Sequence, residues 1–167
     1  MQYKFYNGHM QTTAVPTAVA SGTAIKTLLQ FKPLIPAKIK SINISFDGLT
    51  STTPGVVELI ETDVAATVTA YVAADLTTLD AEALLLGDPT SSLISVGTSA
   101  SGFTASAEGT TTAVRNLLTP VQLPNTGPFI FHWALGDEPV VQANKFCRIR
   151  VTFGTTVNIL CGLTVAF

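Results

Sequence analysis

The sequence predicts an all-β fold, an antiparallel β-sandwich of jelly-roll-like kind with at most one short helix, near residues 75–87. Apolar and polar residues alternate with a period of two in several segments, which is typical of strands with one buried face. These segments are short, rich in β-branched residues and separated by turn-forming residues. A chain of 167 residues fits one domain. We therefore expect a single sandwich domain over residues 23–167, preceded by an N-terminal segment or arm over residues 1–22.

Period and composition together place the strands along the chain. Ile39 is out of phase with Ile42 and Ile44, which predicts a bulge near Lys40 and Ser41. Ser, Thr, Gly and Ala dominate residues 88–112, so this stretch is expected to be one long excursion with little core material. The expected strands are residues 12–19, 23–31, 37–48, 56–62, 66–73, 112–121, 129–135, 145–153 and 156–167, with a further short strand at 92–96.

The last two of these strands are expected to form a hairpin around the turn-like residues 154–156. Both bury their odd-numbered residues, and pairing odd with odd places Cys147 opposite Leu163. Cys147 and Cys161 then become diagonal neighbours about 7 Å apart, whereas a disulfide requires a Cβ separation of about 3.8 Å. The two cysteines are therefore predicted to be buried free thiols.

The low content of charged residues argues against some classes of function and favours others. Charged residues make up 12% of the chain against about 25% in typical domains, and the formal net charge is −2. There is no run of Lys or Arg, so no nucleic-acid partner is expected. No signal peptide is predicted, because the start MQYKFYNGHM lacks an apolar h-region. No membrane span is predicted either, because the longest uncharged runs contain prolines or alternate polar and apolar residues. An apolar, weakly charged chain made in a cytoplasm favours an assembly component.

The segment FIFHWALGDEP is the one place where a histidine and two carboxylates stand close together in the sequence. Strand alternation places His132 on the outer face and makes Asp137 and Glu138 solvated residues of the following turn. Neither nucleotide-binding nor nucleophile motifs are present. We therefore expect no catalysis, no cofactor and no metal. The residues of this segment expected to face the core are Phe129, Phe131, Trp133 and Leu135.

Arg148 and Arg150 lie two apart on one predicted strand, hence on one face and about 6.5–7 Å apart. They are either interface anchors for a partner's carboxylates or part of a solvated face paired with Glu58 or Glu61.

Four stretches carry a family resemblance: GTAIKTLLQFKP, INISFDG, GFTASAEGTTTAVR and FHWALGDEPVVQANKFCRIRVT. They resemble small virion proteins of tailed bacteriophages, of the capsid decoration kind. The resemblance runs through residues 22–166 in short pieces, and its most specific parts are GFTASAEGT and the LG-x-E-P … RIRVT spacing. The chain departs from the pattern at Cys147, where an aliphatic residue is usual, and at QANKF, where a Gly is expected.

The resemblance implies a protein that is synthesised in the host cytoplasm and then coats the outside of an assembled phage capsid. The implied partners are the major capsid protein lattice and further copies of the chain, with a trimer expected. The residues expected to make contacts are Tyr3, Phe5, Tyr6, Phe103, Glu108, Gly109, Arg148 and Arg150. The alternative is a receptor- or carbohydrate-binding sandwich module of a phage tail or fibre. A small hydrolase would instead require His132 within hydrogen-bond reach of a carboxylate.

Overall fold

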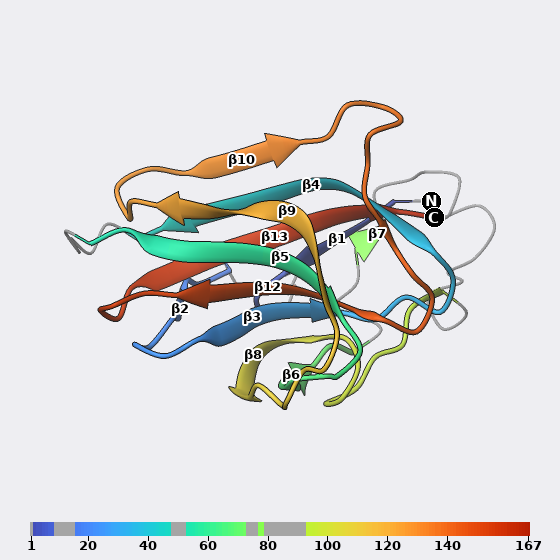
Figure 1. The fold of residues 1–167 in the computed structure, drawn as a ribbon, viewed down its shortest axis with the longest axis horizontal. Coiled ribbons are helices and arrows are strands. Elements are labelled where there is room, and N and C mark those ends of the chain that lie inside the picture. Colours follow the sequence, from blue (N-terminus) through green and yellow to red (C-terminus); the bar gives the residue numbers. More distant parts are fainter. Residues whose placement is uncertain (1, 9–15, 48–52, 73–76, 79–92) are drawn as a thin grey trace.

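The computed structural model describes residues 2–8, 16–47, 53–72, 77–78 and 93–167, and it confirms the all-β sandwich (Figure 1). Two antiparallel sheets pack face to face. The strands are β1 (Gln2–Tyr6), β2 (Val19–Ala20), β3 (Lys26–Phe31), β4 (Ala37–Phe46), β5 (Gly55–Thr62), β6 (Thr67–Ala70), β7 (Thr77–Thr78), β8 (Gly102–Ala107), β9 (Val114–Leu123), β10 (Phe129–His132), β11 (Val140–Val141), β12 (Phe146–Thr152) and β13 (Asn158–Ala166).

The strands are divided between two sheets, here called sheet A and sheet B. Sheet A has the order β10-β4-β13-β1-β7, with β11 also paired to β4 and β2 to β13. Sheet B has the order β6-β8-β3-β12-β5-β9. Successive strands β3, β4 and β5 alternate between the sheets, as do β9, β10, β12 and β13, which is a jelly-roll-like arrangement. The described part of the chain contains no helix long and apolar enough to cross a membrane.

The last two long strands bury the predicted faces, but the predicted hairpin between them is wrong. β12 lies in sheet B between β3 and β5, whereas β13 lies in sheet A between β4 and β1. Cys147 and Cys161 are both free and fully buried, as predicted. Both strands bury their odd-numbered residues, but this does not make them partners in one sheet. Two strands in opposite sheets that face each other across the core also bury their odd-numbered residues.

The predicted bulge in β4 is confirmed. Between two successive residues of β13, the register in β4 steps from Ser41 to Ile39, which leaves Lys40 as an extra residue. The extra residue returns Ile39 to the inward face, so Ile39 and Ile42 are both fully buried.

The N-terminal residues form part of the sandwich. β1 pairs with β13 over its whole length and lies between β13 and β7. Tyr3 and Phe5 are 0% exposed, with the Phe5 ring 4.9 Å from that of Phe31. The expectation that these two side chains reach a neighbouring molecule from an arm is corrected, because they are core residues.

Residues 88–112, which were expected to form one long excursion, include a strand, β8, that their composition did not predict. β8 lies between β6 and β3, and Phe103 on it is only 8% exposed. A Cβ added to Gly102 would lie 2.2 Å from the carbonyl oxygen of Thr69 in β6, so a small residue is required there. At Gly102, the small residue therefore reflects close packing of two strands and not a loop.

Several other expected elements fall wholly or partly outside the described residues. The helix expected at 75–87 is described only at Thr77–Thr78, which form β7. Of the strand expected at 12–19, only Val19 is seen in a strand, β2. Near the expected strand at 92–96, Ile94 and Val96 each make a single bridge.

Candidate functional site

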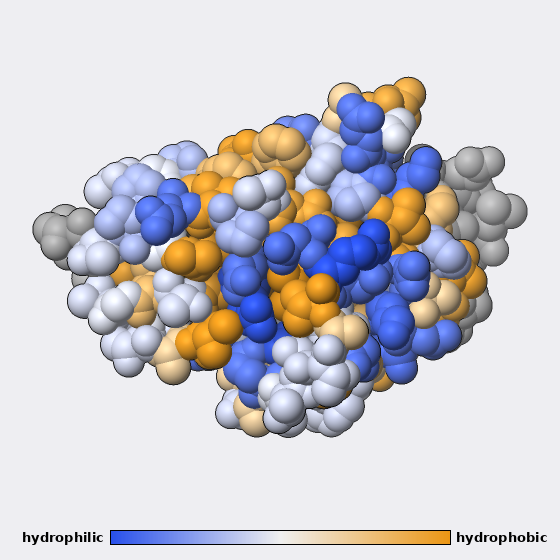
Figure 2. All heavy atoms as spheres, in the orientation of Figure 1, coloured by the Kyte–Doolittle hydropathy of each residue, from blue (hydrophilic) through white to orange (hydrophobic). Residues whose placement is uncertain are grey.

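Among the described residues, the two large apolar side chains with the greatest exposure lie on β10 and in the turn that follows it. Leu135 is 91% exposed and Ile130 is 63% exposed. The turn stands out from the body of the molecule in Figure 1, and Figure 2 shows hydrophobic side chains at its end. We take this edge as the candidate functional site, because several exposed apolar side chains follow one another along the chain there, whereas single exposed apolar residues need no explanation.

Four residues of the FIFHWAL segment were predicted to face the core, and two of these predictions are wrong. Phe129 and Trp133 are partly buried and pack against the core, whereas Phe131 is 37% exposed and Leu135 is almost fully exposed. β10 is the last strand of sheet A, so the opposite sheet covers its inward face only in part. β10 also ends at His132, which places Leu135 beyond the strand.

A tight turn holds Leu135 outward. The Asp137 N–H donates to the carbonyl oxygen of Ala134 at 3.0 Å, and Gly136 between them has φ +98°. A positive φ at the third residue is the requirement of a type II turn, which Gly meets without strain. Leu135 occupies the second position of this turn, at its corner.

Glu138 braces this turn against β4. Its carboxylate accepts the Gly136 N–H at 2.8 Å and an ion pair from the Lys40 ammonium. The Lys40 hydrogen bond first, and then the backbone donors, hold the pKa of Glu138 at about 2. Glu138 was expected to be a solvated turn residue, but it is only 6% exposed. We call residues 133–139 the braced turn.

His132 lies exposed on the outer face of β10, on the same side as Ile130, as the alternation predicted. Its side chain makes no hydrogen bond to any described residue. Within the described ranges there is also no group of three or more His, Cys, Asp or Glu side chains that could hold a metal ion. The arrangement that a hydrolase would need around His132 is not assembled from these residues.

The two arginines of β12 have different environments. Arg148 is fully buried, and its guanidinium donates to the hydroxyl of Thr27 at 2.6 and 2.9 Å and to the Glu108 carboxylate. Burial lowers the pKa of the Arg148 guanidinium, and the Glu108 charge opposes that effect. We call these three residues the buried latch. Arg148 is therefore corrected from an exposed contact residue to an internal one.

Arg150 pairs with a glutamate of the same chain, which was the second of the two alternatives that the sequence left open. Its guanidinium binds Glu58, the residue directly opposite on β5, with N–O distances of 2.8 and 3.2 Å. Glu61, the other candidate partner, instead binds Arg115 on β9.

The buried latch fastens one end of the connection between β8 and β9, residues 108–113. Next to it, Gly109 has φ +69°, and an added Cβ would lie 2.7 Å from the carbonyl oxygen of Ala65. At the other end, the Asp63 carboxylate accepts the Ala113 N–H at 3.0 Å and the Thr112 hydroxyl. This connection, which we call the strap, is thus held on the outer face of sheet B by contacts within the chain. Glu108 and Gly109 were expected to contact a partner, but both are engaged here.

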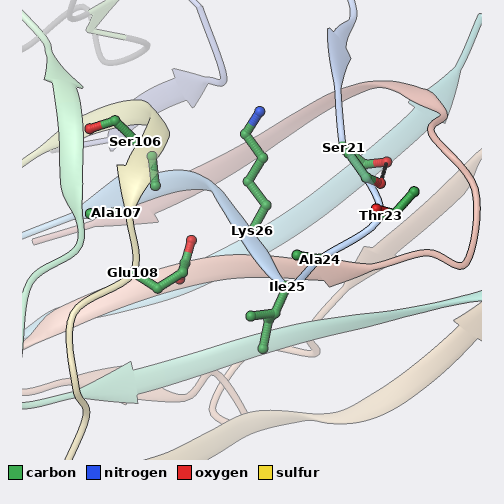
Figure 3. Close-up of a pocket in the computed structure, with 10 residues that line it drawn as sticks. Ser21, Thr23, Ala24, Ile25, Lys26, Ser106, Ala107 and Glu108 are labelled. Atoms are coloured by element: carbon green, nitrogen blue, oxygen red, sulfur yellow. Dashed lines mark hydrogen bonds between the residues drawn. The ribbon is translucent and has the colours of Figure 1, made fainter.

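A pocket of about 320 Å³ lies beside the latch, between residues 21–26 and residues 105–108. In Figure 3, the Lys26 side chain runs between Ser106 on one side and Ser21 on the other, with Glu108 below. The Lys26 ammonium donates to the carbonyl oxygen of Ala20 at 2.9 Å, and Glu108 belongs to the buried latch. Both charges lining the pocket are therefore engaged within the chain.

The structure does not bring the predicted contact residues into one surface. Tyr3, Phe5 and Phe103 are in the core, and Tyr6 is half-buried beneath the Lys4 ammonium, which lies 5.1 Å from its ring centroid. Sequence reasoning predicted a turn here from the Gly and Pro that flank the acidic pair. It missed the contacts by which Glu138 braces that turn, and it placed the end of the strand too late to see that Leu135 is exposed.

Comparisons with protein-family models, curated proteins and solved structures found no match. What the fold and the site define is a β-sandwich whose apolar side chains are displayed at one sheet edge and on one rigid turn.

Proposed function

We propose that this protein is a non-catalytic structural component of a phage virion that binds the outside of an assembled capsid and stabilises it. The observation that carries the proposal is the display of Leu135 on the braced turn. A leucine that is 91% exposed, held by Gly136 and Glu138, is preorganised for insertion into an apolar recess of a partner. Preorganisation matters because a flexible loop would lose conformational entropy on binding.

The role fits the remaining features of the chain. A protein that binds only the assembled shell stabilises it by mass action, without any reaction. A shell offers many identical sites, so multivalent attachment can turn modest single contacts into firm binding. The motifs GFTASAEGT and LG-x-E-P … RIRVT, which resemble those of decoration proteins, are the reason for proposing a phage shell as the partner.

The test is co-sedimentation of the purified protein with assembled phage shells and, separately, with unassembled shell subunits. We expect binding to the assembled shells alone. Burial of one leucine side chain contributes roughly 1.5–3 kcal/mol. Leu135→Ser should therefore weaken each contact by roughly 10- to 100-fold.

A matched control is Ile35→Ser, which removes an apolar side chain that is 42% exposed on another turn of the chain. It should leave binding unchanged. An equal loss for both variants would mean that adhesion is unspecific, and absence of wild-type binding to assembled shells would refute the proposal.

A receptor- or carbohydrate-binding role is the second candidate. It is favoured by the partly exposed aromatic row that begins on β10 and ends just after it, in which the ring centroids of Phe131 and Trp133 lie 5.0 Å apart. Aromatic faces of this kind are suited to stacking on sugar rings. A strong signal on a glycan array, combined with no binding to shells, would favour this role over the first.

A further inference from the structure

We propose that two copies of this protein pair edge to edge through β10, antiparallel, with a two-fold axis at Phe131. The partner is a second copy of this chain, and the pairing would join the two A sheets into one continuous sheet. This inference goes beyond the proposed function, since it concerns the isolated protein and requires no shell.

The backbone of β10 has one open side. Among the strands that the structure describes, β10 pairs with β4 alone, where Phe129 faces Ile44 and Phe131 faces Ile42. The Trp133 N–H donates to the Lys40 carbonyl oxygen at 3.2 Å. Residues 129, 131 and 133 therefore direct their main-chain groups towards β4.

In an antiparallel ladder, alternate residues direct their N–H and C=O groups to opposite sides. Ile130 and His132 consequently present their main-chain groups to the open side. An antiparallel second copy that places Ile130 opposite His132 uses all of these groups in both chains. This register also places Phe131 opposite Phe131 of the second copy.

In this register, aromatic side chains of one copy lie opposite aromatic side chains of the second copy. Under the two-fold operation, Phe129 faces Trp133 of the second copy, and Phe131 faces its own equivalent. Aromatic pairs directly across neighbouring strands are favourable. Within one copy the row is already ordered, because the Phe129 and Phe131 rings are 6.4 Å apart and nearly parallel. The pairing would cover Phe131, which is 37% exposed in the single chain.

The charge distribution also fits a second copy. From Asn116 to Gly136 the sequence contains no Asp, Glu, Lys or Arg. Two copies therefore bring no like charges opposite each other across the paired edges. Edge strands that avoid such pairing carry Lys, Pro or a bulge. β10 has none of these between Phe129 and His132, since Pro128 precedes the strand.

The first test is cysteine cross-linking of the full chain under mild oxidation. Phe131→Cys should give a covalent dimer, because the residue on the axis meets its own equivalent. The control is Leu135→Cys, which is far more exposed but lies off the axis, so it should pair through β10 without giving a covalent dimer. The native thiols of Cys147 and Cys161 are fully buried and do not contribute. No cross-linking of Phe131→Cys, or equal cross-linking of both variants, would overturn the proposal.

The second test is light scattering coupled to size-exclusion chromatography over a dilution series. The wild type should form a dimer, and Phe131→Lys and Phe131→Glu alone should each dimerise at least tenfold more weakly. An equimolar mixture of the two variants should restore the dimer, because Lys then faces Glu. Circular dichroism of each variant checks that the monomer remains folded.

Three outcomes would refute self-pairing: a wild type that is monomeric throughout, a trimer that does not respond to residue 131, or no rescue in the mixture of folded variants. A monomeric wild type whose binding to shells is lost in Phe131→Lys would instead identify a strand of the shell protein as the partner. Failure of shell binding with an intact dimer would count against the proposed function alone.

Discussion

Replacing Glu108 by alanine tests whether the buried latch holds the strap in place. The carboxylate of Glu108 accepts hydrogen bonds from the Arg148 guanidinium and from the hydroxyl of Thr27 at 2.7 Å. Arg148 is 0% exposed, and its other terminal nitrogen, Nη1, has no hydrogen-bond partner among the described residues. Glu108→Ala therefore leaves a buried guanidinium without its counter-charge.

The magnitude follows from what the substitution leaves behind. Removing one partner of a buried ion pair costs about 3–5 kcal/mol. The Glu108 side chain keeps 24% of its exposure, so water can reach part of the vacated site. We therefore expect the lower end, about 3 kcal/mol of unfolding free energy. For a domain of this size, that corresponds to a fall in melting temperature of roughly 6–12 °C.

Glu58→Ala is the matched control for this prediction. It removes the same side chain from the neighbouring ion pair, but the Arg150 left behind is 16% exposed and can be hydrated. The expected loss is at most about 1 kcal/mol. The measurements are urea unfolding and hydrogen exchange of the strap, which should exchange faster in Glu108→Ala only. If both variants lose the same stability, the latch does not hold the strap and the reasoning from burial is wrong.

Two further predictions concern pH and thiol chemistry. The pKa of Glu138 is lowered from 4.5 to about 2, so its ionised form stabilises the fold fully above about pH 4.5, and this contribution is lost as the pH falls towards 2. The melting temperatures of wild type and Glu138→Gln should therefore differ at pH 6 and converge near pH 2, and a constant difference would contradict the assignment. Burial raises the pKa of the thiols of Cys147 and Cys161, so neither should react with a disulfide reagent at pH 8 until urea unfolds the protein. Rapid reaction of the native protein would show that the two sheets are not closed over these thiols.

The sequence predicted which residues are buried better than it predicted which strands are neighbours. Alternation depends on one strand at a time, so the inward faces of β12 and β13 were identified correctly. The bulge at Lys40 was also visible, because an out-of-phase isoleucine has no other simple explanation. Pairing depends on where the chain goes next, and the link between β12 and β13 crosses to the opposite sheet. Period alone does not distinguish that crossing from a hairpin.

The candidate site was less predictable, because it depends on contacts between distant segments. Arg148 and Arg150 are equivalent in the sequence pattern, yet the strap covers one and leaves the other partly exposed. The strap reaches Arg148 only because β8 runs beside β3, which composition did not indicate. Leu135 was assigned to the core because alternation was extended to it from Trp133, although the turn already begins at Ala134.

The placement of charge bears on how the β10 edge would select a partner if it binds one as proposed. Four ion pairs among the described residues engage the side chains of Lys40, Arg115, Arg148 and Arg150. The chain has only nine Lys and Arg residues, so a large share of its positive charge is neutralised internally. What remains outside exerts little long-range attraction or repulsion. Under the proposed function and the proposed pairing, recognition would therefore depend on short-range fit, for which hydrogen bonds hold β10 and the braced turn in fixed positions.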